Sequence, residues 1–206
     1  MKFIFEQQFQ SMKTAYSLLF ILITFTVNAQ EKPEGLFINS KAPEFKLKDQ
    51  SGAEINLKEI RKKGPIVLIF YRGNWCPYCN KELSRMQDSL TFITQKGAQV
   101  IAITPEAPDG ITKTIEKTGA VFPVLHDKDM KIAHAYKVAY QVEERSVERY
   151  KGFGTDLLAI NRQKGKVYLP VPAVYIINKE GSITYRYFNN DYKKRPWVKD
   201  ILEELK

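Results

Sequence analysis

Cysteine and histidine are the scarcest chemically reactive residues in this sequence, with two of each among 206 residues. The two cysteines, Cys76 and Cys79, form a single Cys-x-x-Cys motif. An exported domain held together by disulfides would use more cysteines, placed further apart. A bridge across two intervening residues closes so short a loop that it adds little stability. The motif is therefore interpreted as a reactive pair.

The same scarcity weighs against a metal site. Zinc in proteins needs three or four ligands, and only His126 and His134 are available to join the two cysteines. These histidines lie further apart than the histidines of zinc motifs, and one is expected at a strand end and the other in a helix. We therefore predict no metal and no cofactor, and expect both histidines to be surface or packing residues.

Long hydrophobic runs are absent after residue 30, so no later segment is predicted to span a bilayer. A concentrated stripe of positive charge is also absent, although the formal net charge is +9. The densest basic runs, Arg61-Lys62-Lys63 and Lys193-Lys194-Arg195, are short. We predict no nucleic-acid partner, and interpret the charge as a solvated basic surface.

Residues 1–29 are predicted to be a secretory signal peptide that is not part of the fold. Lys13 precedes an apolar run from Ala15 to Val27, and Val27-Asn28-Ala29 places small residues where a signal peptidase cleaves. Met12 is an alternative start, because it puts a lysine directly before the apolar run. We expect a periplasmic or secreted protein with no stable membrane insertion after cleavage. An uncleaved membrane anchor is the alternative.

Apolar patterns predict the strands. Alternation on both sides of the turn at 49–52 predicts an N-terminal β-hairpin between Phe45 and Leu57. Continuous apolar runs at 65–71 and 99–104 predict buried strands. Further strands are expected at 122–125, 173–178 and 183–188.

Leu83, Met86, Leu90 and Ile93 recur at helical spacing, which predicts one helix from Pro77 to Gly97. Helices are also expected at 111–117, after Asp129, and from Pro196 to the end, whereas 140–166 has no clear pattern. Alternating strands and helices that end in a hairpin predict an α/β domain over 41–206. Its mixed central sheet would carry helices on both faces.

The position of the Cys-x-x-Cys motif at a helix start suits thiol chemistry. Free N–H groups and the helix dipole would stabilise a thiolate at Cys76 and lower its pKa. Cys79, one turn further on, is placed to resolve a mixed disulfide or a sulfenic acid. Trp75 is interpreted either as a docking face or as core packing, and Arg72 either as a positive charge beside the thiolate or as a solvated side chain.

Three segments in this order carry a family resemblance: 70–79 (FYRGNWCPYC), 169–178 (LPVPAVYIIN) and 190–196 (NDYKKRP). From about Lys41 to the C-terminus, the chain resembles the peroxiredoxin-like branch of the alkyl hydroperoxide reductase C/thiol-specific antioxidant family. The resemblance implies a thioredoxin fold, in which a cis-proline faces the active cysteines; Pro172 occupies that place.

The resemblance also contains departures. Aligned on Phe70-Tyr71, the proline of the peroxiredoxin motif becomes Arg72, its threonine becomes Cys76, and its peroxide-attacking cysteine falls on Cys79. The glutamate three residues later is kept as Glu82, whereas Pro172 stands where peroxiredoxins carry a peroxide-holding arginine. Helix-dipole reasoning makes Cys76 the attacking residue and the alignment makes it Cys79.

Two enzymatic functions follow from these observations. The first is a peroxiredoxin-like reduction of hydrogen peroxide or organic hydroperoxides, in which a thioredoxin-like protein or a small thiol regenerates the pair. The second is a thioredoxin-like exchange with the disulfides of exported proteins. A non-catalytic binding domain that keeps only the fold is a third hypothesis.

Overall fold

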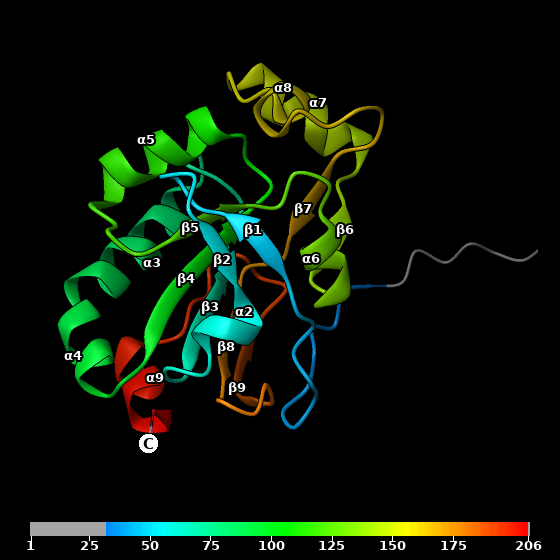
Figure 1. Ribbon diagram of the computed structural model, residues 1–206. Helices are drawn as coiled ribbons and strands as arrows, with labels where there is room; N and C mark the ends of the chain where they lie inside the picture. Colours follow the sequence, from blue (N-terminus) through cyan, green and yellow to red (C-terminus); the bar gives the residue numbers. More distant parts are fainter. Residues whose placement is uncertain (1–31, 206) are drawn as a thin grey trace, which may run out of the picture. The chain divides into compact units, whose positions relative to one another are not determined.

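A five-stranded mixed sheet lies at the centre of the computed structural model, which describes residues 32–205 (Figure 1). The predicted signal peptide and its cleavage site lie outside the described residues. Within residues 32–205, no helix has the length and apolar character needed to cross a membrane.

The sheet has the strand order β5-β4-β3-β8-β9. Its parallel half contains β3 (Ile66–Phe70), β4 (Gln99–Thr104) and β5 (Val124–His126). Its antiparallel half adds β8 (Ala173–Ile177) and β9 (Ile183–Phe188). All five residues of β3 and of β8 are buried, which explains their uninterrupted apolar sequences.

Helices cover both faces of this sheet, as predicted. Alternate residues of β3 belong to two different core clusters, because successive side chains of a strand point to opposite faces. Val67 and Ile69 pack with α3 (Pro77–Asp88), α4 (Leu90–Gln95), α5 (Pro108–Thr118) and α9 (Val198–Glu204). Ile66, Leu68 and Phe70 pack with α2 (Leu57–Ile60) and α6 (Lys131–Ala135).

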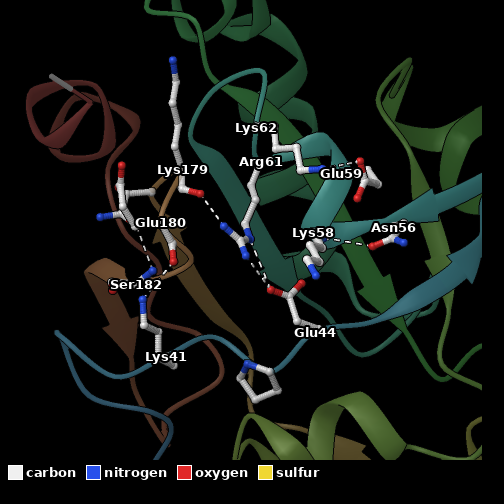
Figure 2. Close-up of polar contacts among 12 residues, drawn as sticks. Lys41, Glu44, Asn56, Lys58, Glu59, Arg61, Lys62, Lys179, Glu180 and Ser182 are labelled. Atoms are coloured by element: carbon white, nitrogen blue, oxygen red, sulfur yellow. Dashed lines mark hydrogen bonds and ion pairs between the residues drawn. The ribbon is translucent and has the colours of Figure 1, made fainter.

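The predicted N-terminal hairpin is present, as β1 (Lys46–Lys48) paired antiparallel with β2 (Glu54–Asn56). Asn56 caps α2 by accepting a hydrogen bond from the backbone N–H of Lys58. Arg61 then joins the hairpin side to the β8–β9 turn: its guanidinium pairs with Glu44 at 2.9 Å and donates to the carbonyl oxygen of Lys179 (Figure 2).

Residues 139–170, which include the stretch 140–166 that had no clear pattern, form a separate excursion from the sheet. It contains β6 (Ala139–Gln141), α7 (Glu144–Gly152), α8 (Leu157–Asn161) and β7 (Tyr168–Pro170), and β6 pairs antiparallel with β7. No side chain of α7 is fully buried, so its sequence does not contain the apolar stripe from which a helix is predicted. The core of the excursion packs instead against Trp75, next to the cysteine motif.

One predicted helix is wrong in its extent. The helix predicted from Pro77 to Gly97 is two helices, α3 and α4, separated at Ser89 (φ −100°, ψ 5°). Both helices keep the predicted apolar stripe against the sheet: Leu83 and Met86 come from α3, and Ile93 from α4. The apolar residues therefore keep their helical spacing on both sides of Ser89, because all of them must face the sheet, even though the regular helix is interrupted at that residue.

Candidate active site

Cys76 is the N-cap residue of α3, at the end of the loop that leaves the carboxyl end of β3. Its backbone is extended (φ −94°, ψ 104°), Pro77 occupies the first turn, and its carbonyl oxygen accepts hydrogen bonds from the backbone N–H groups of Cys79 and Asn80. Gly73 is required in this loop, because at φ 148° a Cβ would lie 2.5 Å from Trp75 Nε1. The loop therefore delivers Cys76 to the positive end of a helix.

The two thiols are both buried but differ in acidity. Cys76 is 1% exposed and Cys79 is 0% exposed, and the two sulfurs are not joined in a disulfide. A hydrogen bond from Cys79 and the charge of Arg72 lower the pKa of Cys76 to about 7, against the opposing effect of burial. Burial and the neighbouring Cys76 raise the pKa of Cys79 well above its ordinary value. In this pair, Cys76 therefore loses its proton more readily than an ordinary cysteine, and Cys79 less readily.

Arg72 is a buried cation held among aromatic rings. Its guanidinium lies 4.1 Å from the ring centroid of Tyr192, 4.6 Å from that of Trp75 and 5.7 Å from that of Tyr150. Arg72 Nη2 also donates to Tyr150 Oη at 2.9 Å. The residue is 2% exposed, so its charge acts on Cys76 with little screening by water. We call these rings and Arg72 the aromatic cover.

Trp75 lies inside this cover and is half-buried. Its ring packs against Tyr150 of α7, with centroids 5.1 Å apart, and it contacts the core of the excursion. The side chain thus takes the packing role that was one of its two interpretations, between the motif and residues 139–170.

Glu82 lies one helical turn beyond Cys79, on the inner side of α3. It is 3% exposed, and its Oε2 atom forms an ion pair with Arg195 Nε at 2.8 Å. Burial raises the pKa of Glu82 to about 8, although Arg195 opposes the shift. Arg195 Nη2 also lies 3.5 Å from Cys79 Sγ. One guanidinium therefore contacts both the carboxyl group and the sulfur.

Arg195 was missed as a site residue, because it belongs to a basic run that was interpreted as solvated surface. Its side chain is only 7% exposed, so that interpretation is wrong for this residue. The 190–196 segment of the family resemblance contained it, and a buried glutamate such as Glu82 requires a cationic partner. The pairing could not be assigned from the sequence, because the two residues meet only in the folded chain.

Glu106 is a second residue that the sequence analysis missed. It follows β4, is fully buried, and accepts hydrogen bonds from the backbone and side-chain nitrogens of Asn74. Lys117 of α5 binds the carbonyl and side-chain oxygens of the same Asn74. Because β3 and β4 are parallel, their carboxyl ends meet, and this placement lets Glu106 hold the loop that carries Cys76.

Pro172 lies between β7 and β8, next to the cysteine loop in the sheet register, because Ala173 pairs with Phe70. The expected cis peptide bond is wrong: residues 32–205 contain none. The trans form of a proline bond is favoured by about 0.5–1 kcal/mol. The preceding Val171 donates its backbone N–H to Val138, which continues the β6–β7 ladder up to the proline.

The histidines lie in separate elements. His126 ends β5, and His134 lies in α6 with its ring packed against Tyr168. Within residues 32–205, no three His, Cys, Asp or Glu side chains are grouped as metal ligands.

Comparison with known proteins shows two groups of relatives. The chain is 29% identical over 137 residues to the thiol-disulfide oxidoreductase ResA of Geobacillus kaustophilus, covering 65% of this chain and 78% of that protein. It is 27% identical over 173 residues to the putative peroxiredoxin bcp of Helicobacter pylori, covering 84% and 99%.

Solved structures confirm the thioredoxin-like fold. The peroxidoxin BcpB of Mycobacterium tuberculosis superposes with a TM-score of 0.64 at 18% identity, covering 82% of this chain and 95% of that one. A putative thiol:disulfide interchange protein DsbE from Chlorobium tepidum superposes with a TM-score of 0.54 at 20% identity, covering 83% and 99%.

A family model described as AhpC/TSA matches residues 38–186, which is most of the chain and includes both cysteines and Glu82. The family resemblance stated from the three sequence segments is thereby confirmed. This protein, with its paired buried thiols at the start of α3, belongs to the AhpC/TSA family of thiol-dependent oxidoreductases.

Proposed function

We propose that the protein is a thiol-dependent peroxidase that reduces hydrogen peroxide or a small organic hydroperoxide at Cys76. One observation carries the proposal: the more acidic thiol is 1% exposed and lies beside the aromatic cover. A peroxide is small enough to reach a sulfur in such a position. A folded protein would need the cover to open before its disulfide could meet Cys76.

The reaction begins with the Cys76 thiolate, which a pKa of about 7 makes abundant at neutral pH. The sulfur attacks the distal oxygen of the peroxide, the O–O bond breaks, and the leaving oxygen takes a proton to form water or an alcohol. Cys76 becomes a sulfenic acid. Arg72 holds a positive charge beside the reacting sulfur and favours the thiolate over the thiol.

Cys79 then resolves the sulfenic acid. Its sulfur attacks Cys76, a disulfide forms, and the hydroxyl group leaves as water. Cys79 must lose its proton in this step, although burial raises the pKa of its thiol. Glu82 is the proposed acceptor in its ionised form, which becomes more abundant as the pH rises toward its pKa of about 8, and it passes the proton to the hydroxyl group that leaves as water. Arg195 stabilises the negative charge on either group.

An external thiol donor, either a thioredoxin-like protein or a small thiol, closes the cycle. Two of its electrons reduce the Cys76–Cys79 disulfide, and the donor leaves in its own disulfide form. The order of the cysteines proposed here follows their pKa shifts and the helix start. It differs from the peroxiredoxin alignment, which assigns the first attack to Cys79.

The disulfide oxidoreductase function is the second candidate. The Cys-x-x-Cys motif at a helix start favours it, as does the likeness to thiol-disulfide oxidoreductases named ResA. On this reading, Cys76 attacks a disulfide of a partner protein and Cys79 releases the reduced partner.

The decisive experiment measures both activities of the protein from Gln30 onward. Peroxide consumption driven by dithiothreitol is compared with the reduction of insulin disulfides, with free cysteine as the reference thiol. We expect peroxide to be consumed far faster than by free cysteine. A peroxide rate equal to that of free cysteine, together with rapid insulin reduction, would reject the peroxidase in favour of the disulfide reductase.

We also propose that residues 1–29 direct export to the periplasm or the exterior, and that 41–206 is the functional domain. The charged start, apolar run and small-residue cleavage site support this proposal. Expression of the whole chain, followed by fractionation and N-terminal sequencing, is expected to recover a periplasmic or secreted form that begins at Gln30. Recovery of the uncleaved chain in membranes would instead support the anchor.

A further inference from the structure

A cleft of about 460 Å³ opens on the outer side of the Glu82–Arg195 ion pair. One wall is a face of α3, because Tyr78, Lys81, Glu82 and Arg85 follow one another at helical spacing. The opposite wall combines Tyr187 of β9 with four residues of the segment before α9: Lys193, Lys194, Arg195 and Trp197. The volume is that of a site for a small molecule.

The cleft carries a concentrated positive charge. Five cationic side chains line it, against the single carboxyl group of Glu82: Lys81, Arg85, Lys193, Lys194 and Arg195. Lys81, Lys193 and Lys194 are exposed, and within residues 32–205 none of their ammonium groups has an ion-pair partner. Low-dielectric walls focus such a field on an anion that enters the cleft.

Aromatic side chains stand at the same opening. Trp197 is 63% exposed and Tyr78 is 39% exposed, and the guanidinium of Arg85 lies 5.5 Å from the Trp197 ring centroid. Exposed apolar surface that is rimmed by charged side chains is typical of ligand-binding grooves. Flat rings next to ammonium groups suit an organic anion better than an inorganic one.

The cleft adjoins the reactive sulfurs from two directions. Arg195 lines it and contacts Cys79 Sγ at 3.5 Å. Tyr78 packs against Tyr192, with centroids 5.9 Å apart, and Tyr192 packs against Arg72 in the aromatic cover. A molecule in the cleft would therefore contact Arg195 directly and would be linked to Arg72 through Tyr78 and Tyr192.

We propose that this cleft binds the carboxylate of a small organic co-substrate of the redox cycle. The inference rests on the proposed peroxidase function and deepens it by naming the substrate chemistry. The carboxylate would lie among Lys81, Lys193 and Lys194, and the organic body would pack on Tyr78 and Trp197. Two co-substrates share this chemistry: a carboxylated hydroperoxide, which oxidises the thiols, and a carboxylated thiol, which reduces the disulfide.

Binding is tested first without turnover. Calorimetry compares naphthoate with its neutral amide, naphthamide, on the intact protein. We expect naphthoate to bind more tightly, and its advantage to shrink as salt is added. Lys193→Glu/Lys194→Glu should weaken naphthoate binding about tenfold or more, and Lys193→Gln/Lys194→Gln by less, because charge reversal adds repulsion to the lost attraction.

The matched control is Lys58→Glu/Lys63→Glu, which makes the same change of charge at the opposite end of β3 from the cysteines. It separates a local effect from the loss of net charge. Thermal unfolding of each variant checks that the fold is kept. The proposal is overturned if naphthoate binds no better than naphthamide, or if the control variant loses as much affinity as the cleft variant.

Kinetics then identify the source of the carboxylate. Cumene hydroperoxide is compared with its carboxylated derivative at fixed dithiothreitol, and mercaptoethanol with mercaptoacetate at fixed hydrogen peroxide. The cleft variant should reduce the preference for the carboxylated member of one pair by about tenfold, relative to the control variant. Equal preferences in both variants for both pairs would overturn the redox role. Selective naphthoate binding without peroxide consumption would retain the binding site and reject the peroxidase.

Discussion

The surroundings of the two sulfurs differ more than their separation of three positions suggests. Cys76 stands before the first turn of α3 and lies near Arg72, the cation of the aromatic cover. Cys79 lies within the helix, backed by the buried carboxyl group of Glu82 and the guanidinium of Arg195. Both thiols are buried, yet the pKa falls at the first and rises at the second. Burial disfavours the thiolate at both sulfurs, but at Cys76 the hydrogen bond from Cys79 and the charge of Arg72 outweigh it, whereas at Cys79 burial is the largest cause of the shift.

Replacing each cysteine in turn is expected to have the largest effect. Cys76→Ser should reduce peroxide consumption to the background of ordinary thiols, because the acidic sulfur is removed. Without an added thiol, Cys79→Ser should permit one oxidation and then stop, because no second sulfur resolves the intermediate. Mass spectrometry after one equivalent of peroxide should find a sulfenic acid only in Cys79→Ser. A sulfenic acid only in Cys76→Ser would reverse the roles, as the peroxiredoxin alignment predicts.

Arg195→Met is expected to have the largest effect on stability. Removing one partner of a buried ion pair costs about 3–5 kcal/mol when the other partner stays charged. Glu82 is mostly protonated at pH 6, so the loss should be small there and should grow as the pH rises above about 8. Denaturant unfolding at several pH values measures it.

The sign of this pH dependence follows from proton linkage. The pKa of Glu82 is raised above its unfolded value, so stability is fully present below that unfolded value and falls as the pH rises toward about 8. Without Arg195, the folded pKa is higher still and the fall continues to higher pH. Adding Glu82→Gln to the Arg195→Met variant should abolish the extra dependence. Persistence of that dependence in the double variant would assign it to another group.

Arg72→Met should act mainly on the chemistry of Cys76. Its loss removes a positive charge beside the thiolate, so the pKa of Cys76 should rise and the peroxide rate at pH 7 should fall by about tenfold. Ultraviolet absorbance of the thiolate across a pH titration measures the shift. Arg145→Met, on the exposed side of α7, is the matched control and should leave the titration unchanged. An unchanged titration in Arg72→Met would remove Arg72 from the account of Cys76.

Tyr150→Phe is expected to have the smallest effect. It removes the hydrogen bond from Arg72 Nη2 but keeps the ring, so the guanidinium should stay between Trp75 and Tyr192. The loss of stability should be about 1.5 kcal/mol, with little change in the pKa of Cys76. Denaturant unfolding and the same thiolate titration test both parts. A large shift of the pKa would mean that the hydrogen bond, rather than the rings, positions Arg72.

Much of the sheet could be predicted because its patterns are local. The apolar runs that became β3, β4 and β8 are buried in the sheet, and an alternating or continuous pattern reports that burial directly. The excursion at 139–170 was not predictable in this way. Its helices carry few buried residues and are held by contacts with Trp75 and its neighbours, which are distant in the sequence.

The residues of the candidate site likewise fall into a group that a local sequence pattern predicts and a group that it does not. Cys76, Cys79 and Arg72 were found from one short segment, and Glu82 from the resemblance to the peroxiredoxin motif. Arg195 lies 116 positions beyond Cys79, and no local pattern joins the two. Glu106 is likewise recognised only when the ends of β3 and β4 meet. Residues that act through contacts with distant parts of the chain cannot be predicted from a local sequence pattern.

The class of chemistry and the family can be recognised without a fold, because a Cys-x-x-Cys pair at a helix start and the three matching segments are local features. The folded chain adds which thiol is acidic, that a trans Pro172 precedes β8, and that Arg195 reaches both Glu82 and Cys79. The physical reason is that desolvation and Coulomb interactions depend on distances in space. Folding brings charges from several elements around two sulfurs that the sequence only places side by side.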